Sequence, residues 1–167
     1  MGNIGLFAID AGGSTGLAWG VVPKGAHPAD VDKRTIKTAT VRDKSEVVQV
    51  RSITRMFNTW VKEVNHRVDG IEIIIEDFVL RPGPHAGGKE GTSSIRIAWG
   101  ITGFLMGQQQ FPGYPIWQTP GEVLGTVTKD RLKEWGLWVV GQEHERDAMS
   151  HLAFRMLHHR IRAGIKS

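Results

Sequence analysis

The chain has 167 residues, a length typical of one domain whose own core can stabilise it. It contains no cysteine, which excludes disulfides, thiolate zinc sites and cysteine nucleophiles. Any metal site must therefore use carboxylates and histidines, a ligand set that favours hard ions such as Mg²⁺ and Mn²⁺. The net charge of +4 suits a polyanionic partner, and it suits an ordinary basic protein as well.

The first residues have no basic stretch followed by an apolar segment, so we do not expect a signal peptide. No run approaches the roughly 18 apolar residues of a membrane span. We therefore expect a cytoplasmic protein.

The first half of the chain predicts three strands and a helix. An apolar run at residues 4–9 indicates a buried strand that ends at Asp10, and residues 15–22 can return beside it after a glycine-rich turn. Residues 35–41 alternate as a third strand does. From Ser45 to Val64 the apolar residues recur at helical spacing.

The second half predicts strands that alternate with helices. Residues 71–78 are strongly β-branched and indicate a central strand with acids at its end. The remaining expected elements are a glycine- and proline-rich loop at 80–92, a helix at 92–105, a strand at 115–118, helices near 119–122 and 129–135, and a last helix at 143–162.

This order predicts an α/β domain that occupies residues 1–167. Three strands form an antiparallel meander, two more strands join it through helical connections, and helices cover both faces of the mixed five-stranded sheet. In the helix at 92–105 we expect Ile95, Ala98, Trp99, Thr102 and Leu105 to face the core. We also expect most of the six tryptophans, Trp117 included, to pack in the core.

Acidic side chains stand at the ends of the two most apolar strands. Asp10 ends the first strand, and Glu76 closes the run of isoleucines. His144 and Asp147 lie three residues apart on the last helix and therefore share one face. Because Asp147 lies at the margin of that helix's apolar face, we expect both groups to meet the strand-end acids.

Each of these residues also has an ordinary interpretation. An Asp after a strand is typical of a turn, and acids in a first helical turn favour the helix dipole. Glu72 is expected on the opposite sheet face or at the solvated strand start, and His151 is expected to be an ordinary helix histidine. The combination favours a site in which two Mg²⁺ ions neutralise the converging acids and promote phosphodiester hydrolysis.

The motifs resemble those of RuvC-type Holliday junction resolvases, most closely phage-encoded ones. Ile-Asp-Ala-Gly-Gly-Ser-Thr-Gly-Leu-Ala-Trp-Gly at 9–20 is similar to the family's first motif, and Ile-Glu-Asp-Phe at 75–78 to its second acidic motif. Residues 94–103 resemble the helix that follows, 118–123 the Thr-Pro segment, and His144-x-x-Asp147-Ala148 the last motif. The resemblance covers nearly the whole chain in the same order.

The resemblance implies an RNase H-like fold, a homodimer, and paired nicks across a four-way DNA junction with Mg²⁺ or Mn²⁺, two ions per site. It implies that Asp10, Glu76, His144 and Asp147 are catalytic and bind the metal. Phe78 corresponds to a junction-stacking aromatic or to a core residue. The Thr-Pro segment lacks the usual lysine, so Lys129, Arg131 or Lys133 is expected to neutralise phosphate instead. The loop that carries Arg81 and Lys89 either enters the DNA junction, where both cations contact DNA, or is a disordered connector.

Three alternatives remain open at this point. One is a phage nuclease that also cuts forks and flaps. Another is a phosphate-binding domain like those of sugar kinases and actin-like ATPases, whose glycine-rich hairpin looks similar, although 167 residues cannot supply the two domains that enclose a nucleotide. The last is an inactive DNA-binding scaffold, which the retained acids argue against because they would repel phosphate.

Overall fold

The computed structural model describes residues 2–77, 89–107 and 115–162. Its strands are β1 (Asn3–Asp10), β2 (Ser14–Pro23), β3 (Ile36–Arg42), β4 (Gly70–Glu76) and β5 (Ile116–Gln118). Its helices are α1 (Glu46–Val64), α2 (Lys89–Met106), α3 (Pro120–Thr126), α4 (Lys129–Glu134) and α5 (Glu143–Arg162). Short 3₁₀ turns occupy Pro28–Asp30, Lys33–Thr35 and Asn65–Arg67. None of the described helices is both long and apolar enough to cross a membrane.

The five strands form one mixed sheet in the order β3-β2-β1-β4-β5. The β1–β2 and β2–β3 pairs are antiparallel, whereas β4 runs parallel to β1 and β5 parallel to β4. This confirms the predicted meander with added parallel strands. Helix α2 begins at Lys89, a few residues before the expected start, within the segment that the sequence assigned to a loop.

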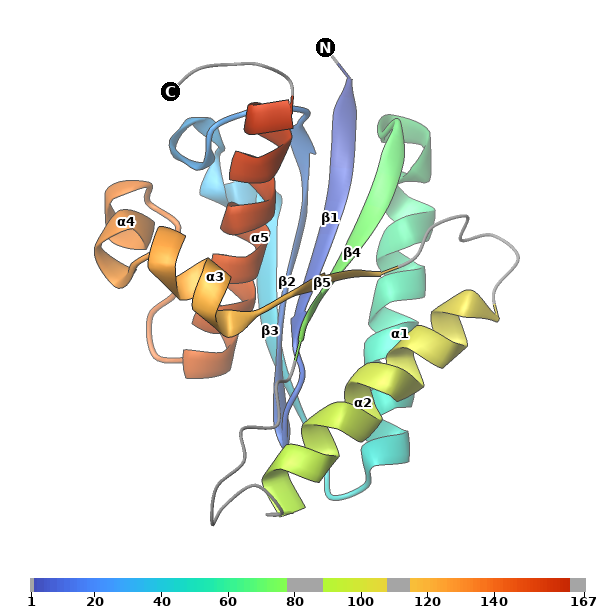
Figure 1. Cartoon of the computed structure of the whole chain (residues 1–167). Helices are drawn as coiled ribbons and strands as arrows, with labels where there is room; N and C mark the ends of the chain where they lie inside the picture. Colours follow the sequence, from blue (N-terminus) through green and yellow to red (C-terminus); the bar gives the residue numbers. More distant parts are fainter. Residues whose placement is uncertain (1, 78–88, 108–114, 163–167) are drawn as a thin grey trace.

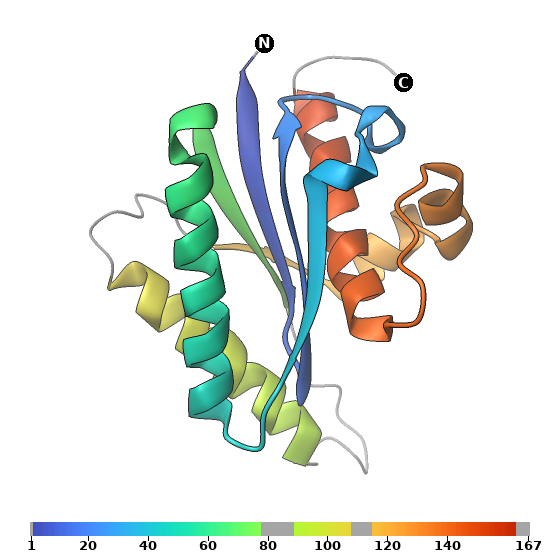
Figure 2. The same ribbon diagram turned by 180° about the vertical axis from the view of Figure 1, so that it is seen from behind.

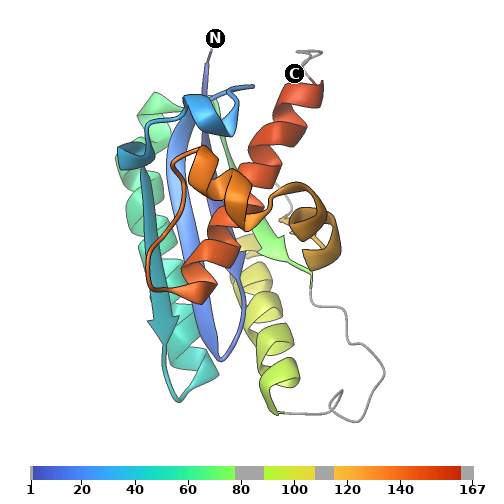
Figure 3. The ribbon, with the colours of Figure 1, turned by 90° about the vertical axis from the view of Figure 1, so that its left-hand side faces the viewer.

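Helices cover both faces of the sheet. Helices α1 and α2 lie on one side, and α5 lies on the other with α3 and α4 beside it (Figures 1 and 2). Seen from the edge, α5 runs obliquely across the strands (Figure 3). The fold is therefore a three-layer α/β arrangement with the mixed sheet in the middle.

Alternation along β1 assigns its side chains to the two faces. Leu6 and Ala8 pack in the cluster that contains α5, whereas Phe7 and Ile9 pack in the cluster that contains α1 and α2. By the same period of two, Asp10 points to the α5 side. On β4, Ile74 likewise faces α5, so Glu76 does too.

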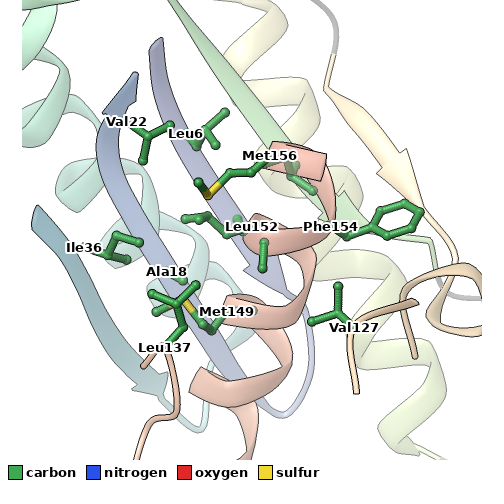
Figure 4. Close-up of a cluster of buried hydrophobic side chains, with 14 of the residues drawn as sticks. Leu6, Ala18, Val22, Ile36, Val127, Leu137, Met149, Leu152, Phe154 and Met156 are labelled. Carbon is green, nitrogen blue, oxygen red and sulfur yellow. The ribbon is translucent and has the colours of Figure 1, made fainter. Parts of the chain in front are cut away.

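The apolar face of α5 forms the core on its side of the sheet. Met149, Leu152 and Met156 pack over β1 and β2, against Leu6, Ala18 and other buried residues (Figure 4). This burial explains why α5 is a helix despite its many charged residues.

The inner face of α2 agrees with the prediction in part: Ala98, Thr102 and Leu105 are buried, Ile95 is half-buried, and Trp99 is exposed. Ile97, Ile101 and Leu105 are fully buried, at a spacing of four residues, and they rotate Trp99 outward to 63% exposure. Trp117, on β5, is also exposed, and its ring centroid lies 5.6 Å from that of Trp99. These two tryptophans are therefore surface residues, contrary to the expectation that they pack in the core.

An ion cluster fastens the C-terminal half of α5 to β4. The Arg155 guanidinium donates to both Glu72 carboxylate oxygens at 2.6 and 2.9 Å, and His159 Nε2 lies 2.9 Å from Oε2. Burial raises the pKa of Glu72, but the hydrogen bonds and charges of His159 and Arg155 outweigh it and lower the pKa to about 2. Glu72 thus faces α5, on the same sheet face as Glu76, and its expected place on the opposite face was wrong.

The N-terminal half of α5 is held by β2 and β3. Glu145 accepts hydrogen bonds from the hydroxyls of Thr38 and Thr40 at 2.6 and 3.0 Å. Gly16, the register partner of Asp10, lies directly beneath the start of the helix. A Cβ on Gly16 would overlap the backbone carbonyl of His144, so a glycine is required for this close approach.

We predict that Gly16→Ala shifts the first turn of α5 and destabilises the fold by about 1–3 kcal/mol, because backbone rather than a flexible side chain must move. Urea unfolding measures the change. Gly13→Ala is the matched control, since a Cβ there meets nothing within 4 Å. Equal stability of the two variants would contradict the proposed contact.

Candidate active site

Two carboxylates meet where β1 and β4 end. Asp10 and Glu76 are the last residues of these neighbouring parallel strands, and both point to the α5 side. Their side chains are hydrogen-bonded to one another. Both are largely buried, with 12% and 14% of their side-chain surfaces exposed. The structure thus brings together the two acids that the apolar patterns of the strands predicted to be neighbours.

Helix α5 adds a histidine and a third carboxylate. His144 Nδ1 lies 3.0 Å from Asp10 Oδ2. Asp10, His144 and Asp147 each offer a ligand atom, and these atoms all lie within 4.8 Å of one another. All four residues that the sequence nominated thus line one pocket of about 340 Å³, which Glu143 and His151 line as well.

Burial and mutual repulsion shift the pKa values of the carboxyl groups in the pocket. Burial, followed by the hydrogen bond to Glu76 and the charges of Glu76, Asp147 and Glu143, raises the pKa of Asp10 to about 9. Burial and the charges of Glu76 and Glu143 also raise the pKa of Asp147. Burial acts the same way on Glu76, but the contact with His151 and the hydrogen bond from Asp10 lower its pKa. Without a cation, Glu76 keeps the charge and Asp10 keeps the proton.

The residues fit a divalent cation. Oxygen and imidazole donors converge from two strands and one helix, and at neutral pH the buried Asp10 carboxyl can ionise only if a positive charge compensates it. Cysteine is absent from the chain, so a hard ion matches the donor set better than a thiophilic one. Asp10, His144 and Asp147 are the residues that would hold it, and Glu76 adjoins them.

The glycine-rich hairpin after Asp10 is fixed by internal hydrogen bonds. The Gly12 amide donates to Thr15 Oγ1, and the buried Gln49 side chain of α1 donates to Gly12 O at 3.1 Å and to Thr15 Oγ1 at 2.7 Å. The hairpin is therefore braced from the far side of the sheet. Gly12 and Gly13 do not adopt positive φ angles, so the close approach at Gly16, rather than a special turn, explains the need for glycine here.

The sequence did not identify three polar residues at or behind the pocket: Glu143 and His151 line it, and Gln118 contacts His151. His151 is 3% exposed, with Nδ1 3.0 Å from Gln118 Oε1 and Nε2 3.6 Å from Glu76 Oε2, so it is not an ordinary helix histidine. Glu143 contributes negative charge from the first residue of α5. Spacings of four on either side of Asp147 could have indicated Glu143 and His151. Gln118 could not be found, because its role depends on strand register.

The candidate DNA-contacting residues fall into two groups. Lys129 and Lys133 of α4 lie 5.2 and 5.5 Å from the centre of the Trp138 ring, and Arg146 of α5 lies 5.0 Å from it. Arg131 instead donates to the Thr126 carbonyl. The second group can be placed only in part: Phe78 and Arg81 are outside the described residues, and Lys89 is described only as the first residue of α2.

Comparison with known proteins supports the fold. No family model and no curated protein sequence matches the chain. Among solved structures, the chain is similar to T. thermophilus RuvC in complex with a Holliday junction substrate. The TM-score is 0.56 and the identity 14%, over 99% of this chain and 98% of that one. The likeness shows that the chain has the RuvC-like form of the RNase H-like fold.

We predict that Asp10→Asn stabilises the metal-free protein at pH 8 but not at pH 4. The folded state holds the Asp10 proton up to about pH 9, whereas the unfolded chain releases it near pH 4. Each rise in pH between these values therefore penalises the folded wild type, by about 1.4 kcal/mol per unit at most, and asparagine removes that penalty.

Thermal unfolding in EDTA at pH 4, 6 and 8 measures this difference. Glu63→Gln, at an exposed position of α1, is the control and should show no such trend. A pH-independent effect of Asp10→Asn on stability would contradict the raised pKa of the buried Asp10 carboxyl.

Proposed function

We propose that this protein is a metal-dependent, structure-selective DNA endonuclease that resolves four-way junctions by paired phosphodiester hydrolysis. The observation that carries the proposal is the convergence of Asp10, Glu76, His144 and Asp147 in one pocket of a RuvC-like fold. The similar solved structure contains a Holliday junction substrate, which supports the choice of branched DNA.

Each residue of the pocket has a distinct task in this proposal. Asp10, His144 and Asp147 would bind a divalent cation, Mg²⁺ or Mn²⁺, and Glu76 would complete the ligand set for a second. Two such ions supply charge neutralisation at the phosphate and activation of water. His144 is more exposed than Asp10 and Glu76, with 44% of its side-chain surface accessible, so it would either ligate the metal or orient the attacking water from the solvent side.

The chain would act as a single nuclease domain, and as a homodimer because resolution requires two symmetric cuts. The surface around Trp138 supports contact with the DNA backbone. Lys129, Lys133 and Arg146 gather over one indole ring, and within the described part of the chain none of them pairs with a carboxylate. Such cations are available to phosphate.

We expect the wild type to nick a synthetic four-way junction in Mg²⁺ or Mn²⁺ and to be inactive in EDTA. Asp10→Asn and Asp147→Asn should each lower the single-turnover rate more than about 100-fold, because even residues behind metal ligands cost 10–100-fold. Glu134→Gln, exposed at the end of α4, is the control.

Rates on four-way junction, fork, flap and linear duplex, measured by denaturing gel, determine the substrate class. Equal rates on the junction, fork and flap would favour a broader debranching nuclease. Cleavage by Asp10→Asn at the wild-type rate would overturn the site.

We predict that the double variant Lys129→Gln/Lys133→Gln binds junction DNA more weakly and with a shallower salt dependence. Each lost phosphate contact should reduce the slope of log K against log salt by about 1. Fluorescence anisotropy at several KCl concentrations measures the slope. Lys62→Gln, exposed on α1 across the sheet, should leave it unchanged. Equal slopes for the two variants would exclude α4 from the DNA interface.

A further inference from the structure

Two buried polar side chains lie behind the proposed metal ligands. His151 on α5 is 3% exposed, and Gln118 at the end of β5 is 4% exposed. Burial of two such groups costs free energy unless each is hydrogen-bonded, and apolar residues would fill the same space without that cost. Their presence beside Glu76 therefore calls for a role other than packing.

The sheet register places Gln118 next to Glu76. The two residues are partners on the neighbouring parallel strands β4 and β5, so their side chains emerge on the same face. His151 reaches both from α5, one helical turn after Asp147. Three elements that are distant in the sequence thus meet at one imidazole ring.

The hydrogen-bond chemistry fixes the orientation of the ring. Gln118 Oε1 can only accept, so His151 Nδ1, 3.0 Å away, must donate. With Nδ1 held in this way, the opposite edge of the ring presents Nε2 to Glu76 Oε2 at 3.6 Å. The imidazole is therefore held by Gln118 on one side and faces the Glu76 carboxylate on the other.

We propose that His151 and Gln118 are positioning residues that set the orientation of the Glu76 carboxylate and thereby the affinity of the site for its metal. This inference rests on the proposed function, because it assumes that Glu76 is a ligand. Groups that support metal ligands in this way typically contribute 10–100-fold to metal affinity or activity. Gln118 acts through His151, and His151 acts through Glu76.

The test is Mn²⁺ binding by isothermal titration calorimetry, which does not depend on DNA cleavage. His151→Phe keeps a planar ring but removes both nitrogens, and Gln118→Leu removes the acceptor from a different element. Each should weaken Mn²⁺ binding 10–100-fold. The double variant should have the same Mn²⁺ affinity, within about twofold, as the single variant that binds Mn²⁺ less tightly, because the two residues act through one contact.

Kinetics separate positioning from general destabilisation. In both variants the KM for junction DNA should stay within about twofold of wild type, while the Mn²⁺ concentration for half-maximal rate rises with the loss of affinity. Thr102→Val is the matched control, since it removes a buried hydrogen bond, from Thr102 Oγ1 to Ala98 O, on the opposite sheet face. It should leave Mn²⁺ affinity unchanged.

The outcomes distinguish this inference from the proposed function. Wild-type Mn²⁺ affinity in both folded variants would overturn the positioning role even if the protein cuts junctions. Weakened Mn²⁺ binding in a protein that cuts no branched DNA would support the positioning role and overturn the proposed function. A wild type that binds no Mn²⁺ would overturn both.

Discussion

The structure depends on a polar seam between α5 and the sheet. One side of α5 presents ionisable side chains at intervals of three or four residues, over its whole length, to the acids Asp10, Glu76 and Glu72 on β1 and β4. The members of the seam on the helix are His144, Asp147, His151, Arg155 and His159. Beside the seam, Met149 and Leu152 of the apolar face are buried in the core. The packing that forms the core therefore also determines which ionisable side chains of α5 face which acids of the sheet.

The two ends of the seam differ in how far their carboxyl groups are neutralised by cationic side chains. At the far end, Arg155 and His159 neutralise Glu72 and keep it ionised. At the strand ends, the four carboxyl groups of Asp10, Glu76, Glu143 and Asp147 share a pocket with two imidazoles, and the pKa values of Asp10 and Asp147 are raised. The stable end holds α5 in place, so the acids at the other end stay together although they repel one another. A bound cation would relieve that repulsion, which makes the end with the excess of carboxylates the natural place for a metal.

Much of this arrangement could be predicted from the sequence. The apolar alternation of β1 and β4 assigned Asp10 and Glu76 to strand ends, and a spacing of three joined His144 to Asp147. The same period of two would have put Glu72 beside Glu76. The spacing of four from Asp147 could have placed His151 on this face of α5. Its contacts with Gln118 and Glu76 could not be inferred, because they depend on where α5 crosses the sheet and on the β4–β5 register. Trp99 was misassigned because the Ile97–Ile101–Leu105 stripe determines the rotation of α2.

The contact between Gly16 and His144 also has a consequence for the order in which the parts of the molecule fold. Asp10 and His144 are 134 positions apart in the chain, and α5 can settle on β2 only after the sheet that carries Gly16 exists. Long-range contacts of this kind form late, since the intervening chain must first be ordered. During synthesis from the N-terminus, Asp10 and Glu76 are made well before α5. A partly made chain therefore carries two of the four acidic and histidine groups but cannot assemble the pocket, so that assembly awaits the last helix.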